Sequence, residues 1–103
     1  MSLELYERSV LRWANERGIF DTPDPRAQFI KTVSEMGELA DNIAKGRYGA
    51  ARDDIGDVLV TLIILSKMLG TDLSECLMEA YDEIRNRKGK MVDGIFIKEE
   101  DVG

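Results

Sequence analysis

The feature that most constrains the fold is a nearly unbroken apolar run from Val58 to Leu65, inside a segment with helical character. In a helix these residues cover the whole circumference, and a helix that is apolar all round must be buried on every side. A chain of 103 residues is long enough for one domain with one core. The other helices of a single chain are too few to cover such a helix on every side, so the sequence predicts a homo-oligomer, either a dimer or a tetramer.

Helical periodicity extends over most of the chain, which has only two prolines, Pro23 and Pro25. We expect helices over residues 2–17, 25–45, 50–69 and 72–87, and therefore an all-α four-helix bundle in a single domain spanning residues 1–103. Asp24 and either Thr71 or Asp72 are the expected N-caps of the second and fourth helices. Two helices should each bury one apolar stripe. The stripes are Phe29, Val33, Met36, Ala40 and Ile43, and Leu73, Leu77, Ala80 and Ile84.

The C-terminal segment changes character. Asp93-Gly94 is flanked by apolar residues, which is a signal for a two-residue hairpin turn. A lone short hairpin is marginally stable, so this C-terminal hairpin or extended arm should pack on the bundle or on a partner subunit. The last residues, 99–103, are expected to fray.

The composition excludes several classes of protein. Fourteen basic against twenty acidic residues give a net charge of −6, which disfavours binding to nucleic acid or to a membrane surface. The apolar run is also far shorter than the roughly 20 residues that span a bilayer. Without histidine, Ser-His-Asp triads and His-ligated zinc sites are impossible. The single cysteine, Cys76, allows no internal disulfide and fits a cytoplasmic location; we expect it to be buried.

Two acidic pairs at matching spacing are the clearest candidate site. Glu35 and Glu38 lie on the second predicted helix and Asp54 and Asp57 on the third, and helical positions three apart face the same way. Four carboxylates from neighbouring helices could converge on Mg²⁺ or Mn²⁺, which prefer oxygen ligands. Solvated helix faces, or acids at the positive end of a helix dipole, are the alternative. The aspartates share a face with apolar residues one turn further on, which favours the metal site and a phosphate-bearing substrate.

Three further features have two interpretations each. The basic residues around Arg85 and Lys88 could bind phosphate oxygens, or could merely complement the dipole at a helix C-terminus. Asp82 could join the metal cluster, or be solvated surface. Trp13 could stack on a nucleotide base, but an aromatic residue at helical spacing is more often part of the core.

Two motifs resemble the paired acidic motif of MazG-like nucleotide pyrophosphohydrolases, which belong to the all-α NTP pyrophosphatase superfamily. They are Ser34-Glu-Met-Gly-Glu-Leu-Ala40 and Asp53-Asp-Ile-Gly-Asp-Val-Leu59. Residues 81–91 and 94–99 are similar to the tail of the small single-domain members. The resemblance covers residues 25–99 and implies a four-helix MazG-like domain that forms dimers or pairs of dimers.

The resemblance implies Mg²⁺-dependent hydrolysis of a nucleoside triphosphate to the monophosphate and pyrophosphate, as in clearing unwanted nucleotides. Glu35, Glu38, Asp54 and Asp57 would be the metal ligands, with Glu35 or Glu38 as the general base. The second motif usually opens with Glu, and Asp54 is one methylene shorter.

The same resemblance suggests that Arg85 and Lys88, with Lys31, hold the phosphate charge. Relatives tend to carry Asn at the position of Asp82, so an additional negative charge stands there. These two departures keep a second hypothesis open, in which the chain is a non-catalytic oligomeric helical module that binds a nucleotide or a protein. A purely structural four-helix assembly is a third.

Overall fold

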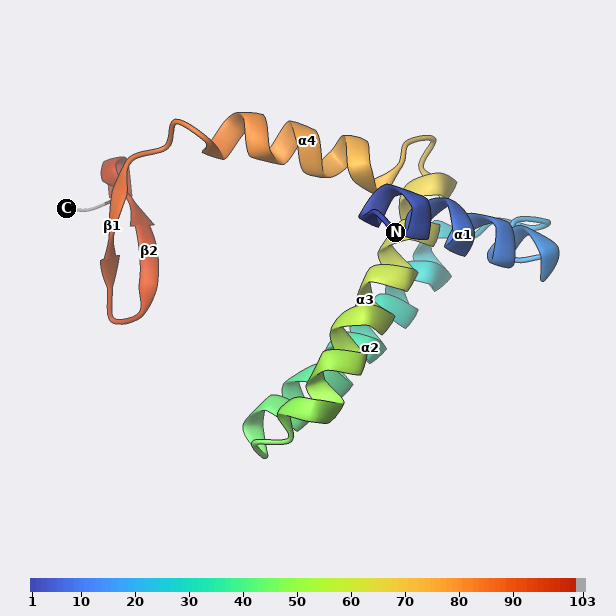
Figure 1. Cartoon of the computed structure of the whole chain (residues 1–103), viewed down its shortest axis with the longest axis horizontal. Helices are drawn as coiled ribbons and strands as arrows, with labels where there is room; N and C mark the ends of the chain where they lie inside the picture. Colours follow the sequence, from blue (N-terminus) through green and yellow to red (C-terminus); the bar gives the residue numbers. More distant parts are fainter. Residues whose placement is uncertain (102–103) are drawn as a thin grey trace.

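The computed structural model describes residues 1–101, and within them it is mostly helical (Figure 1). Four helices are followed by a two-stranded antiparallel hairpin and a short 3₁₀ turn, which confirms the predicted helical fold with a small C-terminal hairpin. The elements are α1 (Leu3–Glu16), α2 (Pro25–Ala44), α3 (Tyr48–Met68), α4 (Leu73–Ile84), β1 (Gly89–Val92), β2 (Ile95–Lys98) and η1 (Glu99–Asp101).

The helix boundaries follow local capping chemistry. The Asp24 carboxylate accepts hydrogen bonds from the backbone N–H groups of Arg26 and Ala27 at 3.1 and 3.2 Å, and Pro25 occupies the first turn as predicted. Asp72 rather than Thr71 caps α4. Two boundaries differ from expectation, since α3 begins two residues earlier than Ala50 and α4 ends three residues before Arg87.

The hairpin forms at the predicted turn. Val92 pairs with Ile95, and the two loop residues between them, Asp93 and Gly94, have φ angles of 51° and 81°, as a type I′ turn requires. At the other end of the hairpin, a side chain on Gly89 would collide with the carbonyl oxygen of Ile97. Residues 99–101 form a turn rather than fraying, and residues 102–103 of the predicted frayed end lie outside the described residues.

Helix α3 is the centre of the packing. It lies side by side with α2 along most of its length, and α1 and the start of α4 also pack on it (Figure 1). Few apolar residues of residues 1–101 become buried, and these are two alanines and two isoleucines. Among residues 1–101 they are Ala14, Ala51, Ile63 and Ile64.

The two predicted apolar stripes are not buried within the chain. On α2, Phe29 is 56% exposed and Met36 is 53% exposed, and on α4 Leu77 is 57% exposed. Cys76 is exposed as well. These burial predictions were wrong for the single chain because periodicity identifies the apolar face of a helix without identifying what covers it.

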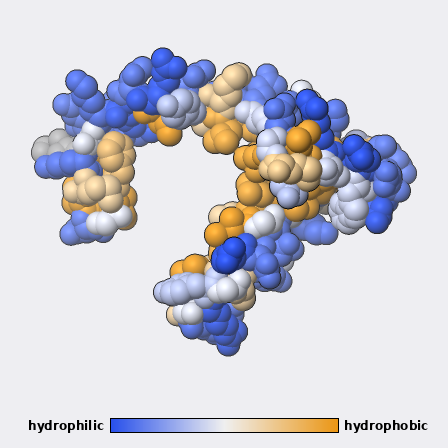
Figure 2. Space-filling view, in the orientation of Figure 1, coloured by the Kyte–Doolittle hydropathy of each residue, from blue (hydrophilic) through white to orange (hydrophobic). Residues whose placement is uncertain are grey.

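The chain forms an open arch rather than a closed bundle. Its radius of gyration is 16.4 Å, whereas a compact domain of this length has about 13 Å. Helix α4 leads away from the α2–α3 pair and carries the hairpin at its far end, where the hairpin's main packing partner beyond its own strands is η1 (Figure 1). Apolar residues gather along the inner side of the arch (Figure 2).

An apolar groove of about 720 Å³ lies between α1, α3 and α4 at the top of the arch, and Leu59, Ile63 and Tyr81 are among its lining residues. Within residues 1–101, none of the helices combines the length and the apolar character needed to cross a membrane.

Candidate functional site

The candidate site lies where α2 meets α3, and the α2 side of this contact is mainly polar. Gln28 and Thr32 are buried there, while Glu35, Leu39 and Asn42 are half-buried at successive turns. Gln28 Nε2 donates a hydrogen bond to the carbonyl oxygen of Thr61 at 3.1 Å, which ties the two helices together. A helix that turns polar groups toward its neighbour must satisfy them by hydrogen bonds, and it leaves its apolar stripe outside.

Glu35 is the electrostatic centre of the site. Its pKa is raised by partial burial between the helices, by the negative charges of Glu38 and Asp57, and by a hydrogen bond to Glu38. Lys31, one turn earlier on α2, acts in the opposite direction and lowers that pKa. Three of the four predicted carboxylates therefore interact across the α2–α3 contact, with one lysine beside them.

Asp54 is held by a hydrogen bond from Asn42, the last member of the polar row that Lys31, Glu35 and Glu38 form on α2. The Asp54 side chain is buried, with 7% of the residue exposed, and its Oδ2 accepts a hydrogen bond from Asn42 Nδ2 at 2.6 Å. The bond joins α2 to α3 and fixes the orientation of the carboxylate. Asn42 follows Glu38 by four residues on the same face of α2, so the spacing was the available signal.

The carboxylates interact but do not converge. Within the described part of the chain, no three Asp, Glu or Cys side chains are close enough together to hold a metal ion. Mutual repulsion is a sufficient physical reason, because carboxylates that share a site disfavour each other's charged form. The fully buried side-chain polar atoms of residues 1–101 all have hydrogen-bond partners.

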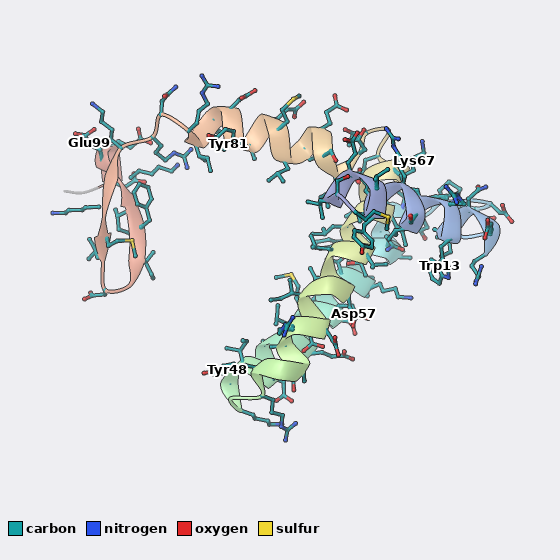
Figure 3. The ribbon with its side chains drawn as sticks, in the orientation of Figure 1. Trp13, Tyr48, Asp57, Lys67, Tyr81 and Glu99 are labelled. Atoms are coloured by element: carbon teal, nitrogen blue, oxygen red, sulfur yellow. The ribbon has the colours of Figure 1, made fainter. Side chains whose placement is uncertain are left out.

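The remaining predicted site residues lie elsewhere in the chain. Arg85 pairs with Asp82 at 3.9 Å on the exposed end of α4, and Lys88 lies between α4 and β1. Figure 3 shows Asp57 on the α2–α3 arm of the arch, whereas Tyr81, on the same helix as Asp82, lies on the other arm. The Arg17 guanidinium lies 5.3 Å from the centre of the Trp13 ring, so that one face of the indole is already covered.

Comparison with known proteins places this arrangement in a family. The model of the MazG nucleotide pyrophosphohydrolase domain matches residues 25–92, which contain both acidic pairs. An uncharacterized 18.2 kDa protein of Haemophilus phage HP1, encoded in the rep-hol intergenic region, is 37% identical over 60 residues. That match covers 58% of this chain and only 37% of the phage protein. No solved structure matches the chain. With two thirds of its residues inside the family model, the chain belongs to the MazG nucleotide pyrophosphohydrolase domain family.

Proposed function

We propose that the chain is a metal-dependent nucleoside triphosphate pyrophosphohydrolase that converts an NTP or dNTP to the monophosphate and pyrophosphate and clears unwanted nucleotides. The observation that supports this most is that the two acidic pairs lie on α2 and α3, which pack side by side and are joined by the hydrogen bond from Asn42 to Asp54, inside the segment that the family model matches. Carboxylates that only keep the surface of one helix soluble would not need acidic residues of a second helix beside them.

The donor set suits Mg²⁺, with Mn²⁺ as the alternative, because both cations prefer carboxylate oxygens. Glu35, Glu38, Asp54 and Asp57 would hold the ion, and the Asn42 hydrogen bond to Oδ2 of Asp54 fixes that carboxylate on α3. A divalent cation bound here supplies neutralisation of the triphosphate and a lower pKa for the attacking water.

Glu35 and Glu38 are the candidate general bases. Whichever of the two is not fully occupied by the metal would accept the proton. That proton would come from the water whose oxygen bonds to the α-phosphorus, while the bond between that phosphorus and the bridging oxygen breaks. Pyrophosphate then leaves with the bonding electrons, so that atoms and charges balance.

The phosphates need positive charge beyond Lys31. Arg85 and Lys88 are on the other arm of the arch in the same chain, so we propose that these residues reach the site from a second copy. The exposed apolar stripe of α2 and the apolar inner side of the arch would then be covered by that copy (Figure 2). We propose one domain, residues 1–103, in which α1 packs on α3 and the hairpin is covered by the second copy.

The test is pyrophosphate release by a matched pair of variants. Glu38→Gln keeps the size of the side chain and removes its charge, and it should lower Mg²⁺-dependent turnover by at least about 100-fold. Glu79→Gln makes the same change at an exposed position of α4 and should leave turnover unchanged. Full activity of Glu38→Gln would refute the assignment.

One observation favours a second function, that of a non-catalytic nucleotide-binding module. Asp54 stands where the family motif usually has glutamate, and its side chain is one methylene shorter, so its carboxylate reaches less far toward a shared metal ion. This alternative predicts that nucleotides bind and raise the melting temperature while no pyrophosphate is released with any NTP or dNTP.

A further inference from the structure

Glu7 is a buried carboxylate that the proposed reaction does not use. It lies on α1 with 6% of the residue exposed, and its hydrogen-bond partners lie 66 and 67 residues away at the start of α4. Oε1 accepts from the backbone N–H of Leu73 at 3.1 Å and of Ser74 at 3.5 Å, and Oε2 accepts from the Ser74 hydroxyl.

These bonds complete the N-terminus of α4. The first backbone N–H groups of a helix have no partner within the helix. The side chain of Asp72, the N-cap, accepts a hydrogen bond from the N–H of Glu75 at 2.7 Å. The backbone carbonyl of Asp72 accepts the first bond within the helix, from the N–H of Cys76 at 3.1 Å. The N–H groups of Leu73 and Ser74 have no partner within the helix, and both donate hydrogen bonds to the Glu7 carboxylate. The cap of α4 is thus shared between its own Asp72 and a residue of another helix.

Helix α4 is otherwise weakly attached. Its main packing partner is α3, and all of its residues from Glu75 to Ile84 are exposed. A helix of 12 residues is about 18 Å long, so a tilt of roughly 10° at its base displaces its end by about 3 Å. The groups that fix the base therefore decide where the residues after α4 are placed.

We propose that Glu7 is a positioning residue, which fixes the direction of α4 and through it the place of Arg85 and Lys88. The first part stands on the hydrogen bonds alone. The second part, that this direction serves nucleotide binding, rests on the proposed function.

The direction of α4 relative to α1 can be followed by energy transfer between two residues of the chain. Trp13 on α1 is the only tryptophan, and Cys76 on α4 is the only cysteine and is exposed. A dansyl group on Cys76 accepts energy from Trp13 and reports the distance between the two helices. Labelled chains would be diluted into an excess of unlabelled chains with Trp13→Phe and Cys76→Ser, so that transfer within one chain dominates even in an oligomer.

Two substitutions separate positioning from capping. Glu7→Ala and Asp72→Ala each remove cap bonds from the same helix end, and each should speed amide hydrogen exchange in the first turn by about fivefold, the factor that fits a typical cap. Only Glu7→Ala cuts the tie to α1, so only it should change and broaden the energy transfer. Glu7→Gln keeps an acceptor oxygen and should restore the transfer, and Glu4→Ala, an exposed change on α1, should have no effect.

Enzyme kinetics test separately whether the direction of α4 matters for nucleotide hydrolysis. Glu7→Ala should lower kcat/KM for the preferred nucleotide by about 10- to 100-fold through misplacement of the basic residues, while Mg²⁺ affinity without nucleotide stays unchanged. Glu7→Asp, whose carboxylate falls short of α4, should behave alike and serves if the alanine variant does not fold.

Unchanged energy transfer in Glu7→Ala or Glu7→Asp would overturn the proposal. An inactive wild-type chain would refute the proposed function and the catalytic part, while the transfer measurement would still decide whether Glu7 directs α4.

Discussion

Replacing Asn42 by alanine tests the architecture of the site at the residue that joins its two helices. The substitution removes the 2.6 Å hydrogen bond to Asp54 and leaves a carboxylate that is only 7% exposed without its donor. Hydrogen bonds to charged groups contribute about 1.5–3 kcal/mol. Alanine recovers up to about 0.7 kcal/mol through its higher helix propensity. The expected net loss of unfolding free energy is therefore about 0.8–3 kcal/mol.

Urea denaturation at one fixed protein concentration measures this loss, because a change in midpoint without a change in slope reports stability. Asn15→Ala is the matched control, since Asn15 is exposed on α1 and the change should leave stability the same or slightly higher. If Asn42 also orients Asp54 toward a cation, Mg²⁺ affinity measured by calorimetry should fall by about 10- to 100-fold. Wild-type stability together with wild-type Mg²⁺ affinity would refute the role given to Asn42.

Three further predictions concern other parts of the molecule. Glu35 has a raised pKa in the folded chain, so its protonation favours folding below its ordinary pKa and this contribution is lost as the pH rises through the raised value. Glu35→Gln should therefore raise the melting temperature in EDTA at neutral pH and have little effect at acidic pH; an equal effect at both would contradict the assignment. Val33→Asp places a charge in the exposed α2 stripe and should reduce the mass measured by light scattering to that of one chain, whereas an unchanged mass would place the interface elsewhere. Gly89→Ala should disrupt the hairpin, seen as loss of amide protection in β1 and β2, because the added methyl group meets the Ile97 carbonyl; intact protection would contradict this steric account.

The local structure could be predicted from the sequence because it depends on neighbouring residues. Asp24 followed by Pro25 specifies a helix start, and Asp93-Gly94 specifies a hairpin turn, and both are present where expected. The acidic pairs likewise occupy facing helices, since Glu35 is influenced by Asp57 across the contact.

What could not be predicted depends on the partner of each face. The apolar stripe that includes Val33 looks like a core face in sequence, yet within the chain the polar face with Gln28 and Thr32 packs on α3. Periodicity gives the polarity of a face and leaves its neighbour open. The capping of α4 by Glu7 could not be predicted either. The residues that donate to Glu7 are 66 and 67 positions away in the sequence, and no local spacing links them.

The proposed reaction is hydrolysis by attack of water at the α-phosphorus. The most direct measurement is turnover of the eight common NTPs and dNTPs in ¹⁸O-labelled water, with Mg²⁺ and with EDTA, followed by mass spectrometry of the products. We expect metal-dependent formation of a monophosphate that carries the ¹⁸O, together with unlabelled pyrophosphate. Label in pyrophosphate, release of diphosphate and inorganic phosphate, or no turnover of any of the eight would contradict it.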